Sequence, residues 1–582
     1  MNIERHLHAI PLVLLLAACA SRPPAPPAVT PASAPERILV LEPFPGVTAT
    51  LVAPAVLDPD RPVELILYAL PNGNTTAETI GRTLTEGVGW RHDIQHIGAQ
   101  TRYLRARGLD QAVVAYLEAD TRSWPEWRRL QGRERAAERI AAMVDVLRAP
   151  FGDARVTLTG HSGGGAFAWG FIDGHAELPA WLARIAFLDS NYSFEPEHGD
   201  KLARWLARDT THTLVVLAYD DREITLDGRK VVSETGGTWR ATHRMIDHLR
   251  PSFTFIEDRQ GEFLRYRSPG IEVLLHPNPE NRILHTELIG ELNGYAHALL
   301  VRRPEYDRGP PVLRRERVYR PWIEGDVALP PPVPPAIPAR APDAITGSAF
   351  IAAVAGLPLA EREAAIRREL LAGNIPSFLR VLRTVQVRAA DTAGVEHTLA
   401  FDVMPDYLAI GSDEDFVRMP MDPYTAQAFC DAFGFTLPTR LVVNQVWAAA
   451  DVKLEPRPLT VARDSAVTFL QHHRIIEEQL AGTPRGAFVA GIKKDVVLSN
   501  RLLERPARVA IYGWHYPNGE PIQPVYAGHV DWYVDYSHGI RPVRRRVRVD
   551  GAERAFEQVL ADPRLRGLLS DEGELKVLRY ER

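Results

Sequence analysis

The sequence predicts an α/β fold for residues 37–305, with a mostly parallel sheet covered by helices on both faces. Short apolar runs rich in β-branched residues alternate here with helical stretches. A strand with one face in water alternates polar and apolar residues. These runs do not alternate in this way, so both faces of the sheet should be buried. One stretch at 156–170 also predicts a strand, then a glycine-rich turn, then a helix of small residues: VTLTGHSGGGAFAWG. In such folds ligands bind at the carboxyl ends of the strands.

The elements of this first half follow in order. The strands are expected at 63–70, 112–118, 155–160, 184–189 and 213–220, with a last one at 283–292. The spacing of apolar residues at 133–149 predicts a long amphipathic helix. A further helix is expected to begin near 296, because Asn293-Gly294 interrupts the pattern before it.

Length and composition predict two main domains. A chain of 582 residues is too long for one hydrophobic core. The proline-rich stretch LPPPVPPAIPARAP marks a boundary, so we expect a linker at 306–342 and a separate α+β domain at 343–582. The second domain should begin with helices and contain a hairpin at 384–403. A net charge of −5, without a basic tract, gives no reason to expect a nucleic-acid partner.

The N-terminus has the features of an export signal. Arg5 precedes an apolar run that is too short to span a bilayer but suits a signal peptide. The run ends in LAAC at Cys19, which resembles a bacterial lipobox, in which the cysteine is lipid-modified and becomes the new N-terminus. Residues 1–18 would then be removed, and the Pro/Ala-rich stretch 19–36 would be a tether. The alternative is an ordinary secretory signal with a chance cysteine.

The residues around the two cysteines bear on location and redox state. Ala20 and Ser21 follow Cys19, with no Asp. By resemblance to the sorting signals of Gram-negative lipoproteins, this favours the outer membrane, facing the periplasm or the cell exterior. The expected partners are the membrane and a cell-wall or extracellular polymer. Cys430 is the only other cysteine and lies on an expected helix face, so we predict a buried structural thiol and no disulfide.

The stretch at 160–164, GHSGG, satisfies the pattern G-x-S-x-G between an expected strand and helix, the context that this motif requires. In such a turn Ser162 takes a strained backbone conformation that raises its hydroxyl above the sheet. Gly163 would present its N–H to a developing oxyanion at the positive end of the helix. Ser162 is therefore predicted to be a nucleophile; the alternative is a serine in a glycine-rich loop.

On these residues the span 37–305 resembles the α/β-hydrolase family. The resemblance implies a serine hydrolase that cleaves an ester or amide bond without a cofactor. It also implies the chain order nucleophile, acid, histidine. Nothing in these residues chooses between an ester and an amide.

The acid is expected after a later strand. Asp221, just beyond TLVVLAYD, is preferred, with Asp220 close behind. One of the two could instead cap the loop or pair with Arg222. Asp189, which ends RIAFLD, is a third candidate, although in most family members the strand there supports the site without supplying the acid.

The histidine is expected after the last strand. His297 is preferred because it would lie on the loop or first helical turn that follows, whereas His285 would lie on the strand and be structural. In the expected mechanism His297 takes the Ser162 proton while the Asp orients and stabilises the imidazolium. A second oxyanion donor is expected in LPNGNTTAETIG, from the N–H of Gly73 or Asn74, where the family often carries His-Gly; a plain turn is the alternative.

The C-terminal half resembles no family that we recognise. Its candidate site consists of ionisable residues that are costly to bury without partners: Lys493, His515, His529, Asp535, His538 and Arg541. Three interpretations stay open: a metal-free catalytic or sugar-binding groove, a zinc site, and a hydrogen-bonded structural network. The spacing H-x5-D-x2-H matches no metal-ligand motif, so no metal is assigned.

Two other classes of function compete with a serine hydrolase. In the first, the chain is a non-catalytic envelope binding protein whose first half is a scaffold. In the second, the active site lies in the C-terminal domain and is metal-dependent or metal-free. Fold analogy alone does not decide between these classes.

Overall fold

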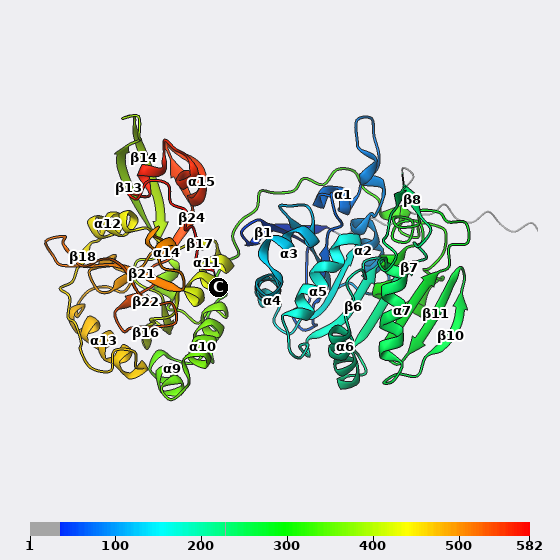
Figure 1. Cartoon of the computed structure of the whole chain (residues 1–582), viewed down its shortest axis with the longest axis horizontal. Coiled ribbons are helices and arrows are strands. Elements are labelled where there is room, and N and C mark those ends of the chain that lie inside the picture. The colour runs from blue at the N-terminus through cyan, green and yellow to red at the C-terminus, as the bar shows by residue number, and fades with distance from the viewer. Residues whose placement is uncertain (1–34, 227–228, 582) are drawn as a thin grey trace, which may run out of the picture.

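The computed structural model describes residues 35–226 and 229–581. The predicted signal peptide, the lipobox cysteine Cys19 and almost all of the tether lie outside the described residues. Figure 1 shows two lobes, the first blue to green and the second green to red, joined by an extended green segment. Within the described ranges, no helix has both the length and the apolar character needed to cross a membrane.

A ten-stranded sheet forms the centre of the first lobe, in the order β1-β2-β4-β3-β5-β6-β7-β12-β11-β10. The strands are β1 (Glu36–Phe44), β2 (Val47–Pro54), β3 (Glu64–Ala69), β4 (Ala112–Ala119), β5 (Arg155–His161), β6 (Leu182–Leu188), β7 (Thr213–Tyr219), β10 (Ile256–Gln260), β11 (Phe263–Ser268) and β12 (Ile271–His276). Pairing is parallel from β4 to β12 and antiparallel at both edges. This pairing confirms the mostly parallel sheet, whose central strands are rich in apolar residues and buried on both faces.

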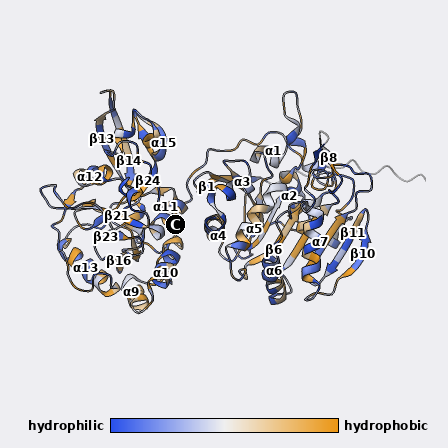
Figure 2. Cartoon of the chain, in the orientation of Figure 1, coloured by the Kyte–Doolittle hydropathy of each residue, from blue (hydrophilic) through white to orange (hydrophobic). Residues whose placement is uncertain are grey.

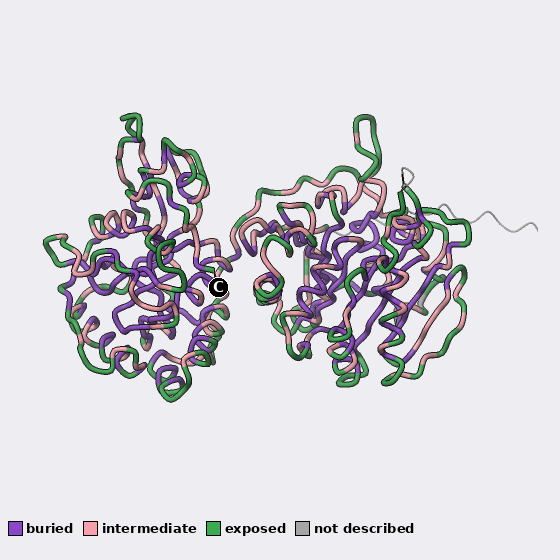
Figure 3. The backbone as a smooth tube through the Cα atoms, in the orientation of Figure 1, coloured by how far each residue is buried: buried purple, intermediate pink, exposed green. Residues whose placement is uncertain are grey.

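Helices cover both faces of this sheet. One face packs α2 (Ile97–Ala106) and α8 (Gly294–Leu300). The other face packs α3 (Trp124–Gln131), α4 (Arg133–Arg148), α5 (Gly165–Asp173), α6 (Pro196–Arg208) and α7 (Thr238–Leu249). Figure 3 shows the buried strands between these layers, with exposed residues gathered on the outer helix faces and loops. The amphipathic helix expected at 133–149 is α4.

The strand expected at 283–292 is absent, and this prediction was wrong. The last parallel strand is β12, and the segment that follows forms successive turns. The backbone N–H of Leu288 donates to the carbonyl of Leu284, and that of Gly290 donates to Thr286. Leu284, Leu288 and Leu292 are all buried, at the spacing of four residues that suits turns rather than a strand.

The second lobe contains two larger sheets, two short two-stranded sheets and several helices, in agreement with the expected α+β class. One larger sheet has the order β13-β14-β24-β17, with β25 on β24, and the other has the order β22-β21-β20-β23. Their strands are β13 (Arg383–Ala390), β14 (Glu396–Val403), β17 (Phe435–Thr436), β20 (Lys494–Val496), β21 (Arg508–His515), β22 (Pro521–Val530), β23 (His538–Gly539), β24 (Val543–Val549) and β25 (Ala552–Ala555). The hairpin expected at 384–403 is β13–β14.

Helices enclose the core of the second lobe. They are α9 (Gly347–Val354), α10 (Leu359–Leu371), α11 (Pro423–Phe433), α12 (Arg440–Ala449), α13 (Ala466–Gln479), α14 (Arg501–Glu504) and α15 (Phe556–Ala561). Cys430 lies on α11 and is a buried free thiol, as predicted. The segment between the lobes is attached to the first one: Val312 and Tyr319 are buried in its core, and Val333 exchanges backbone hydrogen bonds with β1.

Candidate functional site

Ser162 lies in the turn between β5 and α5, and its backbone is in the left-handed region, with φ 55°. A non-glycine residue there is strained, as the strand-to-helix motif requires. Neighbouring glycines permit the turn. A Cβ on Gly160 would lie 2.8 Å from the carbonyl oxygen of Ala69, and one on Gly164 would lie 2.2 Å from it. The backbone of β3 therefore packs directly against the turn and fixes the place of Ser162.

The loop after β3 reaches the same turn, but not through the residues that the sequence favoured. The N–H of Gly73 donates to the Arg122 carbonyl at 2.8 Å, and the N–H of Asn74 donates to the Pro71 carbonyl at 3.3 Å. Neither N–H is therefore free for a ligand, which corrects the expectation that one of them is an oxyanion donor. The side chain of Asn72 lies against Gly163 instead, since a Cβ there would meet its Oδ1 at 2.0 Å.

His285 is paired with Asp189. The ring Nδ1 of His285 lies 2.5 Å from Asp189 Oδ2. Asp189 directly follows β6 and is fully buried, whereas the His285 side chain is 25% exposed, so the opposite edge of its ring is accessible. The second carboxylate oxygen of Asp189 accepts the Thr238 hydroxyl. Thr238 begins α7, so one helix end holds the acid in place.

The same imidazole lies beside the serine turn. Its ring centroid is 4.3 Å from that of His161, the residue before Ser162. His161 Nε2 lies 2.9 Å from the backbone carbonyl oxygen of His285 and donates to it. Burial lowers the pKa of His161 well below its usual value, so this ring is neutral and supports the loop that carries His285. The structure thus brings Ser162, His285 and Asp189 to one edge of the sheet.

His297, the favoured base, lies elsewhere. It is inside α8 and fully buried, and its Nδ1 lies 3.2 Å from the Tyr306 hydroxyl. None of its hydrogen bonds or ring contacts is with Ser162 or Asp221. Burial, and then nearby arginines, lower its pKa to about 3, so it stays neutral in the core. The assignment of His297 is corrected because the segment before α8 is a loop, which brings His285 to the site instead.

Asp221, the favoured acid, contacts no histidine. Its Oδ2 accepts the backbone N–H of Thr238 at 3.0 Å, and its Oδ1 has no partner. Burial, and then the neighbouring Asp189 carboxylate, raise its pKa to about 6. Asp220 instead pairs with Arg222 at 2.6 Å, which is the alternative that the sequence left open. The third candidate, Asp189, is thus the acid that meets a histidine, and Thr238 connects it with Asp221.

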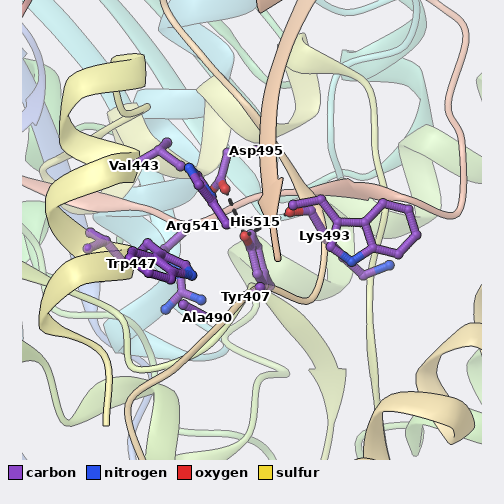
Figure 4. A pocket seen from close by; sticks show the side chains of 11 residues that line it. Tyr407, Val443, Trp447, Ala490, Lys493, Asp495, His515 and Arg541 are labelled. Carbon is purple, nitrogen blue, oxygen red and sulfur yellow. Dashed lines mark hydrogen bonds between the residues drawn. The ribbon is translucent and has the colours of Figure 1, made fainter. Parts of the chain in front are cut away.

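The candidate residues of the second lobe divide into two groups. Figure 4 shows the first group, around a narrow cavity lined by Tyr407, Trp447, Lys493, Asp495, His515 and Arg541, among others. Arg541 donates to the carbonyls of Met404, Pro405 and Val489, and His515 Nε2 lies 2.9 Å from Asn444 Oδ1. Lys493 donates to the Tyr536 carbonyl. Arg541, His515 and Lys493 thus have partners within the fold, which is the pattern of a structural network, whereas Trp447 Nε1 is buried without one.

His529, Asp535 and His538 form the second group, where the ring centroids of the two histidines are 5.8 Å apart. Asp535 accepts the backbone N–H and the hydroxyl of Ser537. Throughout residues 35–226 and 229–581, no group of three or more His, Cys, Asp or Glu side chains is arranged to hold a metal ion.

No protein-family model and no curated protein matches the chain. Solved structures similar to it include a PEG-bound cold-adapted esterase from an Arctic intertidal metagenomic library, at 15% identity and a TM-score of 0.26, covering 46% of this chain and 94% of that one. Another is a mutant feruloyl esterase module from Clostridium thermocellum complexed with sinapinate, at 12% identity and a TM-score of 0.28, covering 44% and 86%. A third is a thermostable esterase, at 13% identity and a TM-score of 0.26, covering 42% and 55%.

The likeness is too distant to carry an argument about this site. Three features of the first lobe stand without this likeness: its strand order, the left-handed backbone conformation of Ser162, and the Asp189–His285 pair beside it. The first lobe is an α/β sheet with a strained strand-to-helix serine next to a buried aspartate that is paired with a partly exposed histidine.

Proposed function

We propose that the first lobe is a serine hydrolase in which Ser162 is the nucleophile, His285 the general base and Asp189 the acid. The observation that carries this proposal is the 2.5 Å contact between His285 Nδ1 and Asp189 Oδ2, beside a serine at φ 55°. A nucleophile, a base and a group that orients the base are the three parts that acyl transfer to serine needs.

The geometry supports these roles. The proton on His285 Nδ1 is held by Asp189, so Nε2 is the nitrogen left to accept a proton from Ser162. Ser162 attacks the acyl carbon, Asp189 stabilises the imidazolium that results, and His285 then protonates the leaving group. Water repeats the sequence on the acyl-enzyme and releases the acid product.

The oxyanion would be stabilised at the start of α5. Backbone N–H groups there, including that of Gly163, lie at the positive end of the helix. The side chain of Asn72 lies against Gly163, so its amide is our second candidate donor in place of Gly73 and Asn74. An Asn72→Ala variant should keep substrate binding and lose most of kcat, because such a donor acts on the transition state.

The substrate and location are proposed from the sequence. LAAC at Cys19 and the tether after it support a lipid-anchored protein of the outer membrane, with access to cell-wall or extracellular polymers. An ester or amide bond in such a polymer is the proposed target.

The test compares three chains that lack residues 1–34: the wild type, Ser162→Ala, and the exposed-serine control Ser252→Ala. Each is assayed for labelling by a fluorophosphonate probe and for hydrolysis of p-nitrophenyl acyl esters and purified peptidoglycan. We expect labelling and hydrolysis in the wild type and the control but not in Ser162→Ala. Hydrolysis that persists in Ser162→Ala would contradict the proposal and place the chemistry in the second lobe.

A further inference from the structure

Aromatic rings form a row at the rim of the β22-β21-β20-β23 sheet in the second lobe. The centroids of Tyr526 and His529 are 5.2 Å apart, and those of His529 and Tyr533 are 4.7 Å apart. His538 follows, 5.8 Å from His529 and 6.2 Å from Tyr533. Tyr526 is 43% exposed and His538 only 1% exposed, so the row leads from the surface to the interior. We call Tyr526, His529, Tyr533 and His538 the ring row.

Lys494 lies at the buried end of the ring row. It is next to His538 in the parallel pairing of β20 with β23, and it is 8% exposed. Its ammonium group makes no hydrogen bond or ion pair with any described residue. Burial, and then the nearby charge of Arg463, lower its pKa, against the opposing charge of Asp535. A buried ammonium group without a partner is costly to the fold.

Asp535 does not neutralise Lys494, because its oxygens are already occupied. Oδ1 accepts the Ser537 N–H at 2.8 Å and the Ser537 hydroxyl at 2.7 Å. Oδ2 pairs with Arg463 at 2.6 Å and accepts the Tyr533 hydroxyl at 3.3 Å. With Arg463 paired to Asp535, Lys494 has no ion-pair partner of its own, and the charge of Asp535 acts on it only without direct contact.

His538 is the second polar group without a partner. Its side chain forms no hydrogen bond within the described ranges, and its Nε2 is buried. Burial lowers its pKa to about 3, so the imidazole is neutral and can donate one hydrogen bond. An ammonium group and an imidazole N–H without acceptors are suited to one anionic group that would accept from both.

We propose that Lys494 and His538 bind the carboxylate of a sugar acid, and that the sugar ring packs against Tyr526 and Tyr533. The oxyanion compensates the buried ammonium group. The exposed ring of Tyr526 and the half-buried ring of Tyr533 offer flat apolar faces with a polar edge, as a hydroxyl-bearing ring requires. The Arg463 side chain is 39% exposed, so the cluster can be reached from solvent on that side. This site is separate from the Ser162 machinery and does not depend on the proposed hydrolase.

The test is a titration of the chain lacking residues 1–34, labelled with ¹³C at its histidine rings. Sodium glucuronate, glucose and sodium acetate are the probes. We expect glucuronate to shift the His529 and His538 signals, glucose to leave them unchanged, and acetate to bind at least tenfold more weakly than glucuronate. Lys494→Met should weaken glucuronate binding at least tenfold, whereas Lys576→Met, which removes an exposed charge in the same lobe, should not.

A second variant and a Tm measurement separate binding from folding. Tyr526→Ala changes an exposed side chain and should weaken glucuronate but not acetate binding. Lys494→Met should keep or raise the Tm, because it removes a buried charge that has no ion-pair partner. Absence of any His529 or His538 shift, equal glucuronate binding in Lys494→Met, or a lowered Tm in that variant would overturn the proposal. Equal binding of acetate and glucuronate would contradict the role of the rings.

Discussion

At the scale of single residues, two carboxylates share one helix end but have different environments. Asp189 is bonded to His285 and to the Thr238 hydroxyl, whereas Asp221 accepts only the Thr238 N–H from the protein. The same threonine thus holds both acids, and the Asp189 carboxylate helps to raise the pKa of Asp221. The two groups therefore have separate contacts: Asp189 is paired with His285, and Asp221 binds the start of α7.

Asp189→Asn should lower kcat by about 10⁴-fold, because the amide no longer fixes the His285 tautomer that leaves Nε2 free. Ester hydrolysis by purified variants is the measurement. Asp220→Asn and His297→Gln are the matched controls and should stay within about tenfold of the wild type if they fold. Loss of activity in Asp220→Asn equal to that in Asp189→Asn would refute this assignment of the acid.

Asp221 should make the first lobe more stable at low pH than at neutral pH. Its pKa is about 6 in the fold, against about 3.9 in an unfolded chain. Between these values the folded chain binds the extra proton, so its stabilising contribution is lost as the pH rises through about 6. Asp221→Asn should therefore raise the free energy of unfolding at pH 7 by about 3 kcal/mol, and with it the Tm, and should have a Tm similar to the wild type at pH 4. A Tm difference that is the same at both pH values would contradict this.

At the scale of elements, the turn from β5 to α5 depends on a close approach of β3. The Gly164 position leaves no room for a side chain, since a Cβ would be 2.2 Å from the Ala69 carbonyl oxygen. This packing keeps Ser162 in its strained backbone conformation. The position of the serine therefore depends on the position of β3.

Gly164→Ala should lower activity more than tenfold and destabilise the first lobe by about 3 kcal/mol or more, because the backbone of β3 cannot yield as a flexible side chain would. Hydrolysis and thermal unfolding measure the two effects. Gly89→Ala is the control, since its added methyl group would meet no atom within 4 Å. Wild-type kinetics in Gly164→Ala would show that the approach of β3 does not position the serine.

At the scale of the whole molecule, charged side chains of the second lobe contact β1 of the first lobe. Glu42 on β1 pairs with Arg545 on β24 at 3.2 Å, and Arg579 lies over the ring of Phe44 at 4.9 Å. Val333, in the segment between the lobes, adds a backbone bridge to β1. Both the Ser162 site and the ring row are thus carried by one chain that we propose is attached to a membrane at Cys19.

Cys19→Ser should move the full-length protein from the membrane fraction to the soluble fraction when it is expressed in a Gram-negative host. It should also abolish incorporation of labelled palmitate, because the thiol is the proposed acceptor of the lipid. Ser21→Ala is the control and should remain membrane-bound and labelled. Palmitate labelling that survives in Cys19→Ser would exclude this anchor.

The sequence by itself determined the features that depend on neighbours in the chain. Buried strands, the amphipathic helix at 133–149 and the turn at Ser162 each follow from a local pattern of apolar residues or glycines. The ionisable residues of the second lobe could also be recognised by type, but not divided into a bonded network and the ring row. That division depends on contacts between residues far apart in the sequence, such as that of Arg541 with the Val489 carbonyl.

Only the tertiary structure decided which acid meets which histidine. Asp189 and Asp221 both follow buried strands, so no local signal separates them, and the Asp189–His285 contact joins residues 96 positions apart. His285 was misplaced because the alternation at 283–292 resembles a strand, while the burial of Leu284, Leu288 and Leu292 favours turns. The physical reason is that pairing across a sheet edge is set by strand order and loop packing, which local propensity does not contain.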